Sequence, residues 1–548
     1  MLLFQDILEL ISAEIRKHFN ALGDKDVIFD PTEHTHVTVR LMRYQGEDGF
    51  PKILDAIQND LKKLEFVGNT NFQNGYLNIE INPEYLLLAI EESVETTGSF
   101  PDSFQDPERI SVEHTSTNPT GPIHMGRIRN SIIGDSIARL LTRYGYRVVT
   151  QYYVNDSGKQ MISLYLGYEK FHSGEKMTEQ IFLDGYRKIY EYFEKNGSEG
   201  EVEGLMEKYE RGDEDLINKV KSIASVMLNS IVDDMEKLNI RMDEFTWESE
   251  FITTGETKEV LERLKGHLKD DGEAKYTDVP GVRKIYLMRK NGTSLYLTRD
   301  IAYHMYKFSQ YDRCIVILGE DQKEHGKVMG YIMSQLLEYQ NTLDYVYYGM
   351  VGLENGKMST RKGTSVNVKE VYKELLDKAV EEIKKRNPDK IDANEIGRKI
   401  AISSLRYYML KISMSKPITF KWQDALDFNG DTAPFIMYSR TRANSILRKV
   451  KEQSQKDLKN MNKEETDLLV EMYKYPYKLK DAFKNLKPET LTSYLFSLSK
   501  KFMHFYENCK IIGEQEGIQG RRLSIVKNFL RIMDDACQIV GIEQVDRM

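Results

Sequence analysis

RISVEHTSTNPTGPIHMGRIRNSIIGDSIARLLTRYGYRVVTQYYVND, residues 109–156, carries three patterns in succession. It opens with the alternating segment RISVEH and closes with RVVTQYYVND, which is rich in β-branched and aromatic residues, so both ends are typical of strands. Between them, apolar residues recur at helical spacing on one face: Ile128, Ile132, Ile137, Leu140 and Leu141. A strand, a helix and a strand in this order predict a βαβ unit and therefore a parallel sheet.

The turn between the first strand and the helix carries the chemistry of this stretch. Two prolines flank a glycine in NPTGPIHMGR, and His124 and Gly126 follow at the start of the helix. Ligands of open parallel sheets bind beyond the carboxyl ends of the strands, where a helix N-terminus offers free N–H groups. His124 can donate to a phosphate oxygen, and Gly126 leaves room for a flat ring. The turn predicts a nucleotide site, with a solvated histidine in an ordinary turn as the alternative.

A second motif, ENGKMSTRKGTSV, occupies residues 354–366 and follows a predicted strand. Lys357, Arg361 and Lys362 place three cations on a short loop between two glycines. Such a loop suits a polyphosphate whose charge grows during displacement. A solvated basic hairpin is the alternative interpretation.

The rest of the chain indicates a multidomain α/β protein. The segment up to about residue 85 has a helical start and ends in NGYLNIEIN, whose alternation predicts a strand. About 165–290 are mostly helical and have the character of an insertion. A second strand-and-helix region runs from SLYLTRD, in which a strand is expected, through RCIVILGEDQKEH to YVYYGMVGL. Beyond about residue 390 the pattern is almost entirely helical.

Composition narrows the class of protein. The net charge of −8 argues against a protein coated in basic surface, although a local basic patch can still meet a polyanion. The three cysteines are widely separated, which excludes a disulfide framework and a cysteine zinc site. The N-terminal apolar residues are interrupted by acids and no apolar run is long enough to span a bilayer, so neither a signal peptide nor a membrane is expected. We expect a cytoplasmic protein.

Together the two motifs resemble the paired signatures of class I aminoacyl-tRNA synthetases. HMGR, residues 124–127, is similar to the HIGH signature, and KMSTRKG, residues 357–363, is similar to KMSKS. The blocks VEHTSTNPTGPIHMGRIRNSIIGDSIARLL, YYVNDSGKQ, LYLTRD and FNGDTAPFIMYSRTRANSILRK resemble arginyl-tRNA synthetases, and the resemblance extends over roughly 109–548. It implies arginine activation by ATP to arginyl-adenylate and pyrophosphate, then transfer of arginine to the terminal adenosine of its tRNA. In this family, activation commonly requires the bound tRNA.

The resemblance also implies the domain plan. A Rossmann-type parallel-sheet catalytic domain is expected over 101–385, with the helical insertion at about 165–290. An N-terminal α+β module, 1–100, would meet the tRNA elbow, and an all-α anticodon-binding domain would occupy 386–548. The implied partners are L-arginine, ATP with Mg²⁺ and the cognate arginine tRNA, and the chain is expected to act as a monomer without a membrane.

The resemblance implies an arginine site made of Glu113, Asn118, His124, Tyr296, Asp300 and Gln322. Asn118 and Gln322 would hold the amino-acid head group, and Tyr296 with Asp300 would hold the guanidinium, for which a carboxylate and a flat ring are suited. Whether Glu113 meets the guanidinium or the α-amino group stays open. Taken singly, each residue could instead be structural.

For the nucleotide, the resemblance implies binding by Pro122, His124, Gly126, Arg127, Lys357, Met358 and Ser359. Catalysis would be positioning and charge stabilisation by His124, Gly126, Arg127, Lys357, Arg361 and Lys362, with no resident metal site. Arg127 stands where the family has the last histidine of HIGH, and Thr360 where it has the second lysine of KMSKS. These departures leave open how the cations divide the phosphate contacts.

Basic helices near the C-terminus are the expected tRNA surface. RTRANSILRKVK supplies the predicted contacts Arg440, Arg442, Arg448 and Lys449, and QGRRLSIVKNFLR adds Arg521, Arg522, Lys527 and Arg531. Tyr438 and Tyr506 are candidates to stack unpaired bases. A solvated helical face is the alternative. Two other hypotheses remain, a small-molecule nucleotidyltransferase and a synthetase-like tRNA-binding protein without catalysis.

Overall fold

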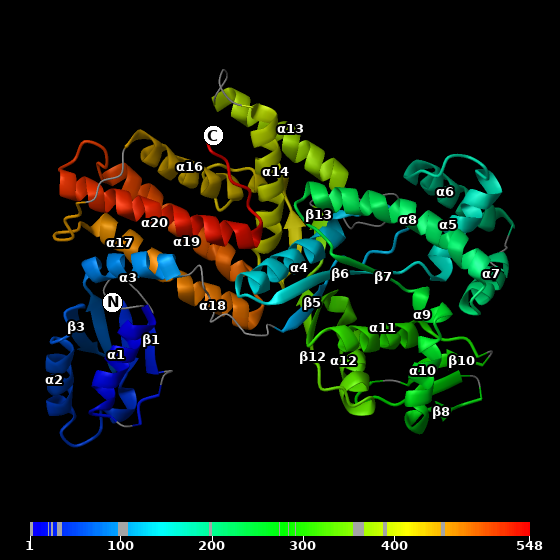
Figure 1. Cartoon of the computed structure of the whole chain (residues 1–548), viewed down its shortest axis with the longest axis horizontal. Coiled ribbons are helices and arrows are strands. Elements are labelled where there is room, and N and C mark those ends of the chain that lie inside the picture. Colours follow the sequence, from blue (N-terminus) through cyan, green and yellow to red (C-terminus); the bar gives the residue numbers. More distant parts are fainter. Residues whose placement is uncertain are drawn as a thin grey trace.

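The predicted βαβ unit forms the centre of the molecule (Figure 1). The computed structural model describes residues 4–19, 21–23, 26–29, 35–96, 108–196, 200–272, 274–282, 284–290, 292–353, 367–386, 392–450 and 455–548. Strand β5 (Arg109–Glu113), helix α4 (Met125–Arg143) and strand β6 (Arg147–Val154) follow one another as expected, and the two strands pair in parallel.

Five parallel strands make up the main sheet, in the order β12-β11-β5-β6-β7. The added strands are β7 (Glu244–Trp247), β11 (Arg313–Gly319) and β12 (Thr342–Tyr348). Successive strands extend the sheet to one side from β5 to β7 and to the other side from β11 to β12. The boundary between β5 and β11 is therefore the topological switch point, where open α/β sheets bind ligands.

Helices cover both faces of this sheet, and its central strands β5, β6 and β11 are accordingly buried along most of their length. On one face α4 packs against β5, β6 and β11, and Ile128, Ile132 and Ile133 are fully buried there. The other face is covered by α11 (Tyr296–Gln310) and α12 (Lys323–Tyr331). Tyr296 thus begins a helix, which corrects the strand expected from SLYLTRD.

The insertion is helical over α5 (Gly158–Phe171), α6 (Glu179–Asn196), α7 (Gly200–Glu210) and α8 (Glu214–Lys237), which enclose a core of their own. The segment expected to be mostly helical includes two more helices, α9 (Glu250–Thr253) and α10 (Glu256–Arg263), and carries strands as well. Strand β7 returns the chain to the main sheet, and a small antiparallel sheet follows, made of β8 (Lys269–Asp270), β9 (Ala274–Thr277) and β10 (Ile285–Arg289).

The N-terminal module is α+β, and its four-stranded sheet has the order β1-β2-β4-β3. Its strands are β1 (Val27–Phe29), β2 (Val37–Arg40), β3 (Val67–Gln73) and β4 (Tyr76–Ile81). As the alternation predicts, Leu77, Ile79 and Ile81 are fully buried on one face of β4. Helices α1 (Phe4–Arg16) and α2 (Phe50–Leu61) pack on the module, and α3 (Pro83–Thr96) leads out of it.

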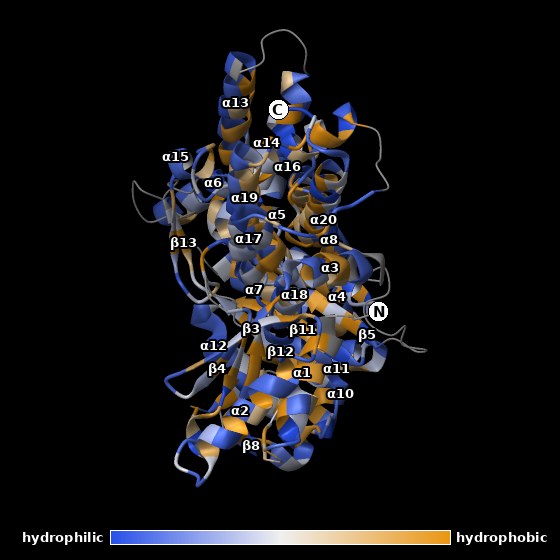
Figure 2. Cartoon of the chain, turned by 90° about the vertical axis from the view of Figure 1, so that its left-hand side faces the viewer, coloured by the Kyte–Doolittle hydropathy of each residue, from blue (hydrophilic) through white to orange (hydrophobic). Residues whose placement is uncertain are grey.

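The C-terminal part is a helical domain that packs on helix α4. It comprises α14 (Ala393–Leu410), α16 (Ala433–Lys449), α17 (Lys463–Tyr473), α18 (Tyr475–Asn485), α19 (Glu489–Asn508) and α20 (Glu516–Val540). Each ribbon alternates between hydrophilic and hydrophobic residues, as amphipathic helices do (Figure 2). Helices α14 and α20 both contact α4. An ion pair between Arg406 of α14 and Asp135 of α4, at 2.5 Å, is buried between them. No helix in the described part of the chain has the length and apolarity needed to cross a membrane.

Candidate active site

A cavity of about 130 Å³ opens at the switch point, between the carboxyl ends of β5 and β11. Its lining includes five of the six residues expected to hold arginine: Glu113, Asn118, Tyr296, Asp300 and Gln322. Arg127, from the first turn of α4, also lines it. The structure therefore brings together residues that lie up to 209 positions apart in the chain, from Glu113 to Gln322 (322 − 113 = 209).

The loop after β5 is held in an unusual conformation. Thr115 and Ser116 have φ angles of 71° and 35°, in the left-handed region that non-glycine residues seldom adopt. Asn130 of α4 accepts a hydrogen bond from the Thr115 N–H at 2.6 Å and donates to the Ile317 carbonyl of β11 at 2.7 Å. This buried amide joins the loop to the neighbouring strand, which fixes the rim of the cavity. Strained backbone held in this way is typical of functional sites.

Asp300 is the buried carboxylate at the base of the cavity, and two histidines contact it. Its Oδ2 lies 2.6 Å from Nε2 of His325 and its Oδ1 lies 3.3 Å from Nδ1 of His304. Burial acts to raise the pKa of Asp300, but the two histidines outweigh it and hold that pKa well below its usual value. Burial likewise acts to lower the pKa of His325, and Asp300 more than compensates, so the pKa of His325 is raised.

Glu113, at the end of β5, is already neutralised by a lysine. Nζ of Lys307 donates to Glu113 Oε2 at 2.8 Å, and the lysine side chain is fully buried. The Ser116 hydroxyl donates to Oε1 at 3.2 Å. Because Lys307 pairs with Glu113, Asp300 is the cavity carboxylate that has no lysine or arginine partner among the described residues, and it is the one left to meet a cationic substrate.

Tyr296, Asn118 and Gln322 line the cavity from three different elements. Tyr296 begins α11 and is 47% exposed, so part of the residue is open to solvent at the cavity. Asn118 lies on the loop after β5, where its amide donates to Gln160 Oε1 at 3.4 Å. Gln322 ends the short 3₁₀ helix after β11 (Glu320–Gln322) and precedes α12. This arrangement leaves two amide side chains at the open side of the cavity.

His124 caps α4 and lies beside the cavity without lining it. Its Nδ1 accepts a hydrogen bond from the Gly126 N–H at 3.2 Å. Burial, with the neighbouring Arg127, lowers the pKa of His124. Because a backbone N–H can only donate, the neutral imidazole must carry its proton on Nε2. That nitrogen is left as a donor near the helix N-terminus, and Gly126 behind it is buried. Pro122 lies half-buried just before it.

The second signature, residues 354–366, falls outside the described residues, and so do the predicted contacts Lys357, Met358, Ser359, Arg361 and Lys362. The residue that follows it is placed. Asn367 forms an antiparallel bridge with His124, and the Val368 N–H donates to the Ile123 carbonyl at 3.1 Å. Asn367, which directly follows the second signature in sequence, thus lies beside His124 of the first.

Sequence reasoning missed His304, Lys307, His325 and Asn130. Asp300, His304 and Lys307 are spaced i, i+4 and i+7, which aligns three ionisable side chains on one helical face. Because a strand is expected at SLYLTRD, the helical spacing of these residues is not considered. Asn130 lies on the predicted helix α4 and His325 lies in the first turn of α12, and the spacing of neither residue indicates its contact, with Thr115 and Ile317 in the first case and with Asp300 in the second.

The predicted tRNA residues separate into buried and exposed groups. Arg440 is 7% exposed, and it bonds Asp534 at 2.5 Å, the Gln544 side chain at 2.7 Å and the Val545 carbonyl at 3.1 Å. The Arg440 guanidinium is therefore inside the domain, where its hydrogen bonds are already made. Arg521 and Arg522 are likewise buried, against Glu465.

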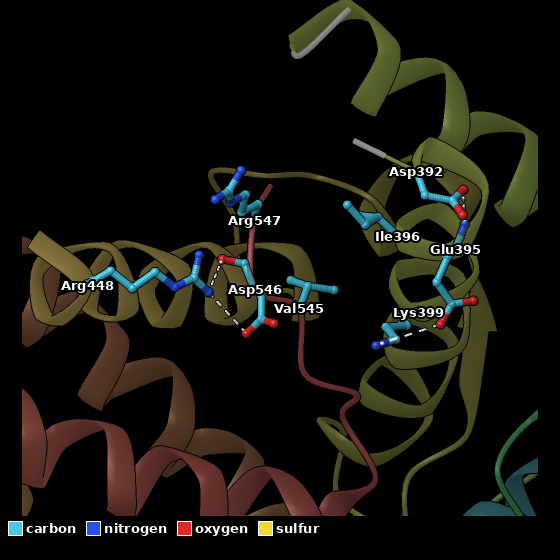
Figure 3. A pocket seen from close by; sticks show the side chains of 8 residues that line it. All are labelled: Asp392, Glu395, Ile396, Lys399, Arg448, Val545, Asp546 and Arg547. Atoms are coloured by element: carbon cyan, nitrogen blue, oxygen red, sulfur yellow. Dashed lines mark hydrogen bonds and ion pairs between the residues drawn. The ribbon is translucent and has the colours of Figure 1, made fainter. Parts of the chain in front are cut away.

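Arg442, Arg448 and Lys449 are exposed on α16. The Arg442 guanidinium lies 4.8 Å from the ring centroid of Tyr438 and 5.7 Å from that of Tyr506. Arg448 pairs with Asp546 at 3.2 Å, at the side of a cavity of about 530 Å³ that Lys399 and Arg547 also line (Figure 3). Cations and aromatic rings therefore share this end of the domain.

Comparison with known proteins agrees with this arrangement. Residues 95–422 match the family described as tRNA synthetases class I (R), catalytic domain, and residues 436–548 match the DALR anticodon binding domain. The arginine–tRNA ligase of Thermoplasma acidophilum is 42% identical over 552 residues, covering 100% of both chains. That of Archaeoglobus fulgidus is 34% identical and covers 98% of this chain and 99% of its own.

Among solved structures, the arginyl-tRNA synthetase of Thermus thermophilus has a TM-score of 0.83 at 24% identity, covering 99% of this chain and 100% of its own, and so shares the fold. The two family matches and the full-length relatives account for the catalytic sheet and the helical domain alike. This chain belongs to the arginyl-tRNA synthetases, a family of class I aminoacyl-tRNA synthetases.

Proposed function

We propose that this chain activates L-arginine with ATP and transfers it to the terminal adenosine of its cognate tRNA, as a monomer in the cytoplasm. The observation that carries the proposal is the cavity at the switch point, which is lined by Tyr296 and by Asp300, a buried carboxylate with no lysine or arginine partner within the part of the chain that the structure describes. A planar cation is bound best by a carboxylate and a flat aromatic neighbour. Asp300 and Tyr296 would hold the guanidinium, and Asn118 with Gln322 the head group.

The nucleotide would lie at the N-terminus of α4. His124 would donate its Nε2–H to a phosphate oxygen, Gly126 would admit the flat part of ATP, and Arg127 would add positive charge. The second signature would close the site with the three cations and with Met358 and Ser359. Mg²⁺ would accompany ATP as the counter-ion of its phosphates.

Pyrophosphate exchange into ATP tests the proposed function. We expect exchange with arginine, and with none of lysine, cysteine or glutamate, and we expect it to require added tRNA. Exchange with another of these amino acids would contradict the arginine site. No exchange with any amino acid, despite tRNA binding, would favour a tRNA-binding protein in which Arg127 and Thr360 mark lost chemistry.

Arginine affinity should fall as the pH is lowered from about 8 to about 6. His325, whose pKa is raised, becomes a cation at Asp300, in the place that the guanidinium would occupy. Arginine itself does not titrate there. Lower pH therefore favours protonated His325 over the guanidinium as the partner of Asp300. The arginine KM should rise by up to about tenfold per pH unit.

The check on this pH dependence is His325→Asn, which keeps an amide donor for Asp300 but does not titrate. The variant should show a nearly flat arginine KM over the same range, and the ATP KM serves as an internal control. Equal pH slopes in the wild type and the variant would assign the effect to another group.

Arg442→Ala should weaken tRNA binding, whereas Arg440→Ala should chiefly destabilise the domain. Arg442 is exposed over two tyrosine rings, so its loss removes a phosphate contact and about one unit of the salt slope. Arg440 is buried beside the partly exposed Asp534, and losing its charged hydrogen bonds costs about 1.5–3 kcal/mol of the free energy of unfolding. Salt-dependent tRNA binding and thermal melting of both variants separate the effects. Unchanged binding by Arg442→Ala would move the tRNA surface elsewhere.

A further inference from the structure

Arg129 lies on α4, two residues beyond Arg127, and is fully buried. Its guanidinium donates to five main-chain carbonyls: Met409 at 3.3 Å, Gly349 at 2.8 Å, Lys416 at 2.6 Å, Ile412 at 3.0 Å and Ser413 at 3.0 Å. No described carboxylate forms an ion pair with it. Burial lowers the pKa of Arg129 to about 10, so it stays charged at neutral pH. A buried guanidinium with every N–H satisfied by backbone indicates a fixed geometry.

The five carbonyls belong to two segments that touch one another. One runs from the last turn of α14 through the turn that follows it, and the other is Gly349, just after β12. The Gly349 N–H donates to the Met414 carbonyl at 2.7 Å. A Cβ on Gly349 would lie 2.6 Å from the carbonyl carbon of Lys416, so only glycine allows this approach. Arg129 therefore holds together two stretches of backbone that are in direct contact.

Both segments continue into functional parts of the chain. Beyond Gly349, β13 (Val351–Leu353) pairs in parallel with β14 (Ile418–Phe420) and then leads into the second signature. Beyond the signature, Asn367 bridges His124. The described residues on the two sides of 354–366 are thus both held against α4, Gly349 by Arg129 and Asn367 by His124. The turn that Arg129 binds also leads, through β14, to α16 of the helical domain.

We infer that Arg129 is a positioning residue for amino-acid activation: it holds the backbone at Gly349, which leads into β13, in place against α4, whose N-cap is His124. Arg129 does not line the cavity, so it acts through the backbone that it holds. The inference rests on the proposed function. It predicts that disturbing this contact lowers kcat for adenylate formation and leaves the binding of arginine and of tRNA as it was.

Arg129→Lys is the direct test, because lysine keeps the charge but offers three donors from one point instead of a planar fork. Arg139→Lys is the matched control. Arg139 lies on the same helix and also donates to carbonyls, of Asn239 at 2.6 Å and Gln538 at 3.4 Å, but at the end of α4 remote from the cavity. Gly349→Ala is an independent disturbance of the same contact that leaves Arg129 in place.

Each variant is assayed for exchange kcat, for arginine and ATP KM, for tRNA affinity and for melting temperature. We expect kcat to fall about 10–100-fold in Arg129→Lys and in Gly349→Ala, since a misplacement of about 1 Å can cost about 10² in rate. The arginine KM and the tRNA affinity should stay within about threefold of wild type, and Arg139→Lys should keep wild-type kcat.

A kcat within about twofold of wild type in folded Arg129→Lys would overturn the inference and leave Arg129 a structural residue. Should that variant fail to fold, Gly349→Ala decides by the same criterion. An equal loss of kcat in Arg139→Lys would also overturn the inference, because any disturbance of α4 would then be enough to lower kcat. Absence of exchange in the wild type would instead contradict the proposed function.

Discussion

Asp300→Asn should raise the arginine KM about 10²–10³-fold while ATP binding is retained. Asp300 is 6% exposed and is the carboxylate of the cavity that no lysine or arginine neutralises. Removing one partner of a buried, hydrogen-bonded charge pair costs about 3–5 kcal/mol, which corresponds to this loss of affinity. Asparagine keeps the shape of the side chain and an oxygen toward His325, so the helix should remain folded. The measurement is the arginine dependence of pyrophosphate exchange.

Glu324→Gln is the matched control for Asp300→Asn. It removes a carboxylate from α12 next to His325, but its side chain is exposed and does not line the cavity. Its arginine KM should stay within about twofold of wild type. An arginine KM for Asp300→Asn within about threefold of wild type would remove Asp300 from the guanidinium site, whatever the effect on kcat.

The βαβ unit could be predicted because the periodicity of its strands, the periodicity of its helix and the residues of its turn all indicate the same structure. RISVEH and RVVTQYYVND have strand periodicity, the segment between them has helical periodicity, and the turn carries proline and glycine where the chain must reverse. SLYLTRD lacks this agreement. Its leucines alternate as in a strand, and the helix that begins at Tyr296 has no side-chain cap to announce it. Packing against β11 decides the helix, and a short window of sequence does not contain that information.

The sequence predicts which residue types the site contains, but it does not predict which of them point to the surface and which to the interior. Arg440 and Arg442 belong to one basic run, yet on a helix residues two apart point to different faces. Arg440 is buried against Asp534 and Arg442 lies over two tyrosines at the surface. Arg127 and Arg129 divide in the same way, one lining the cavity and the other fully buried. Which face turns inward depends on the α4 and α20 packing, which no local pattern specifies.

His124 invites a pair of substitutions that separate two roles of one imidazole. Its Nδ1 caps α4 by accepting the Gly126 N–H at 3.2 Å, and its Nε2–H is the donor that we assign to a phosphate oxygen. His124→Asn retains an N-cap acceptor but has no atom at the position of Nε2. His124→Gln reaches toward the position of Nε2 with an amide donor but is a poor N-cap.

If the phosphate contact matters, the two variants should rank in opposite order for stability and for activity. His124→Asn should melt close to wild type yet lose about 10²–10³ in kcat for exchange, the usual cost of removing a preorganised donor to developing charge. His124→Gln should lose about 1 kcal/mol of the free energy of unfolding while keeping more kcat than His124→Asn. Arginine KM should change little in either, because His124 does not line the cavity. The reverse order, with the less stable variant also the less active, would mean that His124 serves the helix and that the phosphate donor is another group, for which Arg127 is the nearest candidate.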